Sequence, residues 1–318
     1  RDGLDQLADF LTSDGEEIVY QGTDPSSAST WGMVGRWRLP RPLGAPHRCV
    51  MRHGGDALLM TDQGVVPLSA FRSGRDVAEV IDKYAVTSTI SPTWREIADD
   101  YRSSSNWGIC ELHRLGLVVM NTPWGAANAR QVVLSENGAL SRWAGIPAAV
   151  WAEGLGGRVF AGGATDAGVV YLYGEDTTDN TSGIRAESVT AFTTLASPGR
   201  TKRAQMVQPI FRDAVGVDLT VKVLTDWQVP TARIDALGEA LTAPNVPPLL
   251  GNASFLYWDE DDWDEGLWAG SENDVYKPRL SSMNIGQAFA VRVFMVTGNG
   301  RPAWLGNNLI VEAGGPTG

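Results

Sequence analysis

The stretch that decides the fold class is residues 47–68, HRCVMRHGGDALLMTDQGVVPL. It holds three short runs rich in β-forming residues, at 47–52, 57–61 and 65–68, and glycine-containing segments separate them. Glycine accepts the positive φ angles that tight hairpin turns need, so each of these segments can reverse the chain. The stretch therefore predicts a three-stranded antiparallel meander.

The same theme repeats on both sides of this meander. Further strands are expected at 7–12, 17–21, 31–39, 107–112, 115–121, 131–134, 139–143, 148–153, 158–161 and 169–173. A recurrence of roughly 40–50 residues, with three or four strands in each unit, is typical of β-propeller blades around a channel. These units lack the Trp-Asp dipeptide that ends WD40 blades, so the agreement is one of architecture. The units number about four, fewer than a common propeller uses, and we expect the remaining blades in a preceding segment.

A helical insert near 76–103 interrupts the repeats. Val77, Val80, Ile81 and Tyr84 recur at the spacing of one helical face, which predicts an amphipathic helix at 76–84. A second helix is expected at 93–103, with Ser91 as its N-cap and Pro92 in its first turn. Two interpretations stay open, a helical hairpin packed on a sheet edge or an arm toward a neighbouring subunit.

The second half of the chain has longer predicted strands. A polar segment at 174–183 indicates a domain boundary. Strands are then expected at 184–195, 203–212, 217–226, 289–297 and 304–311, with Val217, Leu219, Val221 and Val223 on one face. We therefore predict a mainly-β protein: propeller-like blades at 1–176 and a β-sandwich platform domain at 177–318.

Composition limits the function classes. The 318 residues carry a net charge of −11 and include twelve Trp, 36 Gly and 17 Pro. This acidic balance argues against a protein that grips nucleic acid with a basic patch, but an acidic wall lets DNA slide past because it repels phosphates. No apolar run reaches the length of a membrane span.

The chain start and the cysteines add little chemistry. The first residues hold no apolar signal segment, and the absence of an initiator Met suggests a piece of a longer polypeptide. Cys49 and Cys110 are expected as free thiols. His47, Cys49 and His53 lie close together but lack the paired-ligand spacing of zinc sites. No phosphate-binding loop, nucleophile elbow or HExxH helix occurs, so no catalytic residue, metal or cofactor is predicted.

The most unusual motif is WDEDDWDEGLW at 258–268, which places Trp258, Trp263 and Trp268 five residues apart. That spacing fits neither one helical face nor one strand face, and the aspartates can open Asx-turns. We interpret the indoles as interface anchors. The acidic residues are Asp259, Glu260, Asp261, Asp262, Asp264 and Glu265. They fail the EF-hand pattern, so a solvated acidic surface or channel lining is expected, with an irregular calcium site as the alternative.

Three basic residues, Arg36, Arg38 and Arg41, form a small group around Trp37. Arginines beside a tryptophan can hold a phosphate or a partner carboxylate. We expect these residues at an interface, and the alternative is an ordinary charged strand face.

Two early segments, FLTSDGEEIVYQGTDPS at 10–26 and GGDALLMTDQGVVPLS at 54–69, resemble a family of tailed-bacteriophage virion proteins. The WDxxxWDxxxW loop at 258–268 is similar to loops in such proteins. These proteins resemble the tail hub or nozzle of short-tailed phages, a hexameric tube below the portal and adaptor.

The resemblance implies a structural role, since no catalytic motif comes with it. It implies a homo-oligomer of six copies in the virion tail, assembled in the bacterial host cytoplasm, which forms or closes the DNA exit channel. The implied partners are the adaptor, the fibres and, transiently and without sequence specificity, the genomic DNA. Two other classes stay open: a tail-associated glycan depolymerase or hydrolase, and a carbohydrate-binding receptor-recognition protein.

Overall fold

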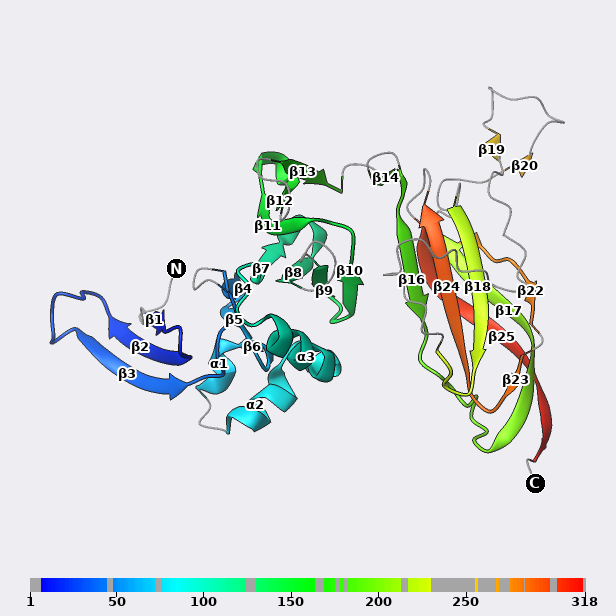
Figure 1. Cartoon of the computed structure of the whole chain (residues 1–318), viewed down its shortest axis with the longest axis horizontal. Coiled ribbons are helices and arrows are strands. Elements are labelled where there is room, and N and C mark those ends of the chain that lie inside the picture. The colour runs from blue at the N-terminus through cyan, green and yellow to red at the C-terminus, as the bar shows by residue number, and fades with distance from the viewer. Residues whose placement is uncertain are drawn as a thin grey trace. The chain divides into compact units, whose positions relative to one another are not determined.

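The computed structural model describes residues 7–44, 48–72, 76–123, 130–163, 169–174, 178–179, 182–212, 217–229, 255–256, 267–268, 275–282, 284–297 and 302–316. The fold is mainly β, with several small antiparallel sheets (Figure 1). It divides into two compact units, Arg1–Glu175 and Asp176–Gly318.

Four small sheets follow one another in the first unit. The first sheet comprises β1 (Leu7–Leu11), β2 (Glu16–Gly22) and β3 (Trp31–Arg38); the second, β4 (Val50–His53), β5 (Asp56–Thr61) and β6 (Gly64–Pro67). The third comprises β7 (Gly108–Leu112), β8 (Leu117–Thr122), β9 (Arg130–Ser135) and β10 (Leu140–Trp143); the fourth, β11 (Ala148–Glu153), β12 (Val159–Gly163) and β13 (Val170–Tyr173). In each sheet the strands pair in chain order, so every sheet is an antiparallel meander. The meander predicted at 47–68 is confirmed.

Hydrophobic clusters join each sheet to the next. One cluster combines Leu39 after the first sheet with Leu59 and Val66 of the second. A second cluster packs Met60 of the second sheet with Met120 of the third, and a further cluster packs Val119 with Trp151 of the fourth. Each sheet is therefore held by apolar side chains of its neighbour, which is the main stabilising term for a fold of short strands.

The helices of the first unit lie against the second sheet. They are α1 (Leu68–Phe71), α2 (Val77–Tyr84), the 3₁₀ turn η1 (Ser88–Ile90) and α3 (Ser91–Tyr101). Val80 and Ile81 are buried in the cluster shared with the second sheet, and Trp94 is buried against Trp107 in the next cluster. One detail of the prediction is wrong: Ser91 is the first helical residue and Ile90 the N-cap, because η1 runs directly into α3.

The second unit contains a three-stranded and a five-stranded sheet that share one core. One sheet comprises β16 (Arg185–Val189), β24 (Phe289–Thr297) and β18 (Val217–Thr225). In the other, β17 (Arg200–Arg212) pairs with β21 (Val275–Tyr276), β22 (Leu280–Ser281), β23 (Ile285–Gly286) and β25 (Ala303–Pro316). The core combines Val221 of β18 and Val293 of β24 with Phe211 of β17. The predicted inward face of β18 is confirmed for Leu219, Val221 and Val223.

The strand expected at 184–195 is shorter than predicted, since β16 ends at Val189. Leu195 and Ala196 have positive φ angles of 50° and 58°, which is a turn conformation for residues that carry a Cβ. Two further short strand pairs are β14 (Thr178–Asp179) with β15 (Ser182–Gly183), and β19 (Phe255–Leu256) with β20 (Leu267–Trp268). Further 3₁₀ turns occur at η2 (His113–Leu115) and η4 (Leu155–Gly157).

Candidate interface surfaces

The fourth sheet has one outer face built of apolar residues. The β11–β12–β13 register places Ala152, Phe160 and Leu172 in one cross-strand row, and Val150, Gly162 and Val170 in the next. Residues directly opposite one another share a face of a sheet. Val150, Val170 and Leu172 are 52%, 66% and 49% exposed. We call these six residues the fourth-sheet face. It is unusual, because the solvated face of an antiparallel sheet is normally polar.

The opposite side of the same sheet is packed. Trp151 and Tyr173 contact Trp143 of the third sheet, and the ring centroids of Trp143 and Tyr173 are 5.1 Å apart. Burial among these rings raises the pKa of the Tyr173 hydroxyl to about 12. Trp151 also donates from Nε1 to Oδ1 of Asn121 at 3.0 Å. The fourth sheet is thus anchored by its inner face and presents an apolar outer face.

The first sheet also exposes an apolar face, in which a row of aromatic rings crosses all three strands. Phe10 meets Tyr20 edge to face at 5.7 Å, and Tyr20 lies parallel to Trp31 at 5.7 Å. The register places Ala8 and Met33 opposite Tyr20, and Ile18 opposite Phe10. Phe10 is 54% exposed and Met33 is 60% exposed. We call Ala8, Phe10, Ile18, Tyr20, Trp31 and Met33 the first-sheet face.

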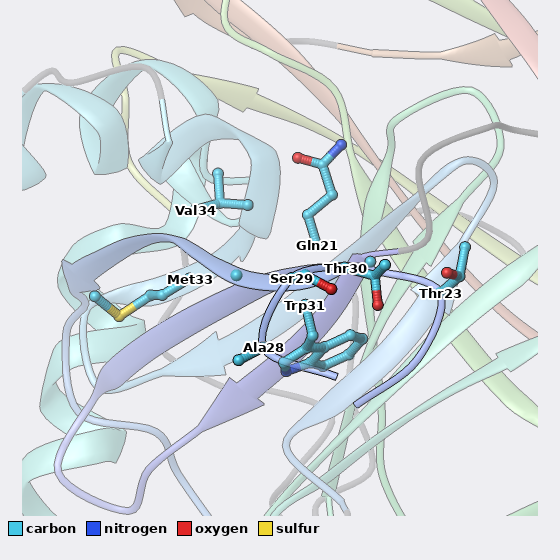
Figure 2. A pocket seen from close by; sticks show the side chains of 10 residues that line it. Gln21, Thr23, Ala28, Ser29, Thr30, Trp31, Met33 and Val34 are labelled. Atoms are coloured by element: carbon cyan, nitrogen blue, oxygen red, sulfur yellow. The ribbon is translucent and has the colours of Figure 1, made fainter. Parts of the chain in front are cut away.

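An open hollow lies at the end of this face, where β2 and β3 are joined. Its volume is about 500 Å³, and its walls include Gln21, Thr23 and the segment from Ala28 to Val34. Figure 2 shows Trp31 beside Ala28 and the hydroxyl side chains of Ser29 and Thr30. Val34 is the extra residue where the register shifts between Val19 and Tyr20, which is a β-bulge. The hollow therefore combines one indole with several polar side chains.

The inner face of the first sheet is fixed by a buried ion-pair network. Arg72, which follows α1, donates to Glu17 Oε1 from Nε at 3.1 Å and from Nη2 at 2.6 Å. It also pairs with Asp9 Oδ2 at 2.9 Å. Burial raises the pKa of the Glu17 carboxyl above 4.5, and the hydrogen bonds and charge of Arg72 oppose the rise. Glu17 Oε2 is buried with no hydrogen-bond partner among the described residues.

Strand alternation separates the residues of the predicted basic patch. Arg36 and Arg38 lie on the outer side of β3, where Arg36 pairs with Glu16, and Arg41 is exposed beyond the strand. Trp37 points to the inner side and packs on the cluster around Leu39. The patch therefore joins two exposed arginines on one face, and Trp37 contributes to the core. The alternation of side chains along a strand could have predicted, from the sequence alone, that Trp37 points away from Arg36 and Arg38.

The aromatic-acidic motif falls mostly outside the described residues. Outside the described residues lie Trp258, Trp263 and all six acids, which are Asp259, Glu260, Asp261, Asp262, Asp264 and Glu265. Trp268 belongs to β20, whose backbone pairs in parallel with β19. The interface role of the three tryptophans and the solvated surface formed by the acids stay predictions.

Other chemistry-bearing side chains are held in local contacts. His53 Nδ1 lies 3.1 Å from Glu111 Oε1, and His113 Nδ1 lies 3.6 Å from the same oxygen. Cys49 is a buried free thiol, and Cys110 is a half-buried one. Among the described residues no group of three or more His, Cys, Asp or Glu is arranged to hold a metal ion. His47 lies outside the described residues.

Scans of the sequence against protein-family models and against curated proteins find no match. None of the helices in the described part of the chain is long and apolar enough to cross a membrane.

The aromatic row of Phe10, Tyr20 and Trp31 was missed by sequence reasoning. It depends on cross-strand register, which a bulge at Val34 shifts by one residue.

Proposed function

We propose that this chain is a structural subunit of a bacteriophage tail, in which several copies form a hub or nozzle ring around the DNA exit channel. Two lines of argument support the proposal. The segments at 10–26 and 54–69 resemble such virion proteins, and they fold into the β1–β2 hairpin and the β5–β6–α1 region. The chain also exposes two apolar sheet faces, a feature of proteins that work in assemblies.

In this proposal the four meanders are propeller-like blades. β7 lies beside both β4 and β11, so the first strand of the third sheet neighbours the first strands of the sheets before and after it. That is the neighbour relation of inner strands around a propeller channel. The shared core of the two sheets in the second unit supports a β-sandwich platform.

The observation that carries the proposal is the fourth-sheet face. A solvated sheet face with six apolar residues costs free energy in a monomer, since apolar area in contact with water is unfavourable. The sequence keeps Val150, Val170 and Leu172 exposed in the isolated chain. A subunit whose working state is an assembly has a reason to keep them.

Cryo-electron microscopy of the virion, or native mass spectrometry of the assembled tail, tests the proposal. We expect a ring on the tail axis, with six copies, in contact with the adaptor and the fibres. A lone copy on the axis, or three copies in a slender fibre, would overturn it.

The hollow beside Trp31 supports a second candidate function, carbohydrate recognition. Aromatic rings flanked by hydroxyl and amide groups can bind sugars, because a sugar presents both an apolar ring face and polar hydroxyls. Binding of host-envelope glycans to the purified chain, lost in Trp31→Ala and kept in Trp37→Phe, would favour this candidate. If no glycan binds to the wild-type chain, this candidate function is overturned.

A further inference from the structure

We propose that the fourth-sheet face of one copy of this chain binds the first-sheet face of a second copy. This inference rests on the proposed function, because it names the contact that would build the ring. The occupant of each face is a specific surface of the same chain. The contact would be head to tail, so one copy supplies strands β11, β12 and β13 and the next supplies strands β1, β2 and β3.

Contacts inside the chain already show how its sheets associate. The second and third sheets are joined by Met60 and Met120, and the third and fourth by Val119 and Trp151. In both cases an apolar face of one sheet packs with apolar residues of the next. The fourth-sheet face and the first-sheet face are the two apolar outer faces of the first and last sheets in this series. Joining them between copies would extend the same mode of packing.

The number of open faces favours a second copy as the partner. When the fourth-sheet face of one copy contacts the first-sheet face of the next, each copy takes part in two contacts, one through each face. Such contacts generate rings when the rotation between copies closes. A single type of contact then covers both apolar faces of every copy. A self-paired contact of either face alone would leave the other face in water.

The distribution of charge agrees with this pairing. The fourth-sheet face consists of Val150, Ala152, Phe160, Gly162, Val170 and Leu172 and carries no charge. On the first sheet Arg36 lies in the same cross-strand row as Phe10 and Ile18, where it pairs with Glu16, and Arg38 lies one row further from Tyr20. The contact therefore buries no unpaired charge at its centre, which would be costly. Figure 1 shows the joined ends of β2 and β3 extending away from the other sheets of the unit, where a neighbour can reach them.

A mixing experiment with two variants of the full chain tests the contact. One variant carries Val170→Asp and Leu172→Asp, which places charges on the fourth-sheet face. The other carries Phe10→Asp and Met33→Asp on the first-sheet face. Leu155→Asp is the matched control, since Leu155 is 100% exposed in the turn between β11 and β12 and lies on neither face.

Native mass spectrometry and light scattering supply the readout. The wild type and the control should form the same ring. Each double variant alone should remain a monomer, because its dissociation constant should rise by roughly 30-fold or more. An equal mixture of the two variants should form a species of two chains, twice 34.2 kDa, and nothing larger. In that pair the intact fourth-sheet face of one variant meets the intact first-sheet face of the other.

Other outcomes overturn the contact. If each variant alone forms a dimer and mixing adds no new species, the faces pair with themselves. If both variants form the wild-type ring, the ring is built by other surfaces, so the contact fails while the proposed function stands. A wild type that stays monomeric up to millimolar concentration also overturns the contact, whereas the proposed function is decided separately by imaging the virion.

Folding of the variants is checked independently. Circular dichroism and the unfolding midpoint of each double variant should match those of Leu155→Asp, because the substituted side chains are about half exposed or more. If the aspartates unfold the chain, Val170→Thr with Leu172→Thr, and Phe10→Thr with Met33→Thr, replace them in the same mixing scheme. The expected species and the contradicting species are unchanged.

Discussion

At the scale of single residues, Arg72 adds an ion-pair network to the apolar contacts that attach the first sheet to the rest of its unit. Its guanidinium contacts Glu17, whose side chain is 1% exposed, as well as Asp9. We predict that Arg72→Ala lowers the free energy of unfolding at pH 7 by about 3 kcal/mol, because it leaves a buried carboxylate without its cation. Urea unfolding of both proteins measures the difference. Arg36→Ala is the matched control: it breaks an exposed pair with Glu16 on the opposite face and should cost less than about 1 kcal/mol.

The Arg72–Glu17 pair also predicts that the loss of stability caused by Arg72→Ala depends on pH, and the pKa of Glu17 sets the direction of that dependence. Burial raises the pKa of Glu17 in the folded chain above its ordinary value of 4.5. The folded state therefore binds the proton more tightly than the unfolded state, and the cost of the buried carboxylate appears as the pH rises above about 4.5. Removing Arg72 removes an opposing influence and raises this pKa further. The loss caused by Arg72→Ala should thus shrink as the pH falls from 7 to about 4.5, and a loss that is constant over this range contradicts the assignment.

Gly15 gives a second residue-scale prediction, in the turn between β1 and β2. Its φ angle is 85°, and a Cβ would lie 2.6 Å from the carbonyl oxygen of Leu39. Gly138 has a φ of 81° with nothing within 4 Å of its Cβ position. Both alanine variants carry the cost of a left-handed backbone, about 1 kcal/mol, but only Gly15→Ala adds a collision with backbone. Thermal unfolding should show a clearly larger loss for Gly15→Ala, and equal losses would contradict the steric argument.

At the scale of elements, the sequence predicted the meanders well because glycine turns and β-rich runs are local signals. The four strands from Gly108 to Trp143 and the three strands of the second sheet occur where the pattern places them. The open faces were not predictable in the same way. Whether Phe10, Tyr20 and Trp31 form one row depends on a bulge at Val34 and on pairing between strands. The boundary at Ile90 depends on η1 continuing into α3, which no residue preference near Ser91 reveals.

The tryptophan motif at 258–268 gives the element-scale prediction. If Trp258, Trp263 and Trp268 anchor a contact, replacing all three by alanine removes large apolar surfaces from it. A buried tryptophan replaced by alanine costs about 3–5 kcal/mol, and interface hot spots are rich in tryptophan. We expect the triple variant to fold but to lose assembly into infectious particles, as measured by particle yield. Normal yield would show that the motif is not an anchor.

At the scale of the whole molecule, two of the basic residues are engaged in contacts within the chain. Arg36 is paired with Glu16, and Lys202 is 4% exposed. The ammonium of Lys202 donates to the carbonyl oxygens of Ser197 at 2.6 Å, Arg200 at 3.1 Å and Gln287 at 3.3 Å. Lys202 therefore serves the internal structure of the second unit rather than a subunit contact or a constriction of the channel. Arg38 and Arg41 are exposed, and they are the better candidates for such positions.

The net charge of −11 then predicts how the chain behaves toward DNA. Like charges repel phosphates over about 10 Å at 0.1 M salt, so a channel lined by this chain would let DNA pass without binding it. The isolated protein should show no tight binding to duplex DNA in fluorescence anisotropy, even at low salt where electrostatic attraction is strongest. Changing Asp259, Asp261, Asp262 and Asp264 to Asn, and Glu260 and Glu265 to Gln, removes six negative charges. If these acids line the channel, this variant should slow DNA ejection while ring assembly is kept. Tight, salt-sensitive binding by the wild type, or a continuous basic lining in the assembled tube, would contradict the acidic-channel model.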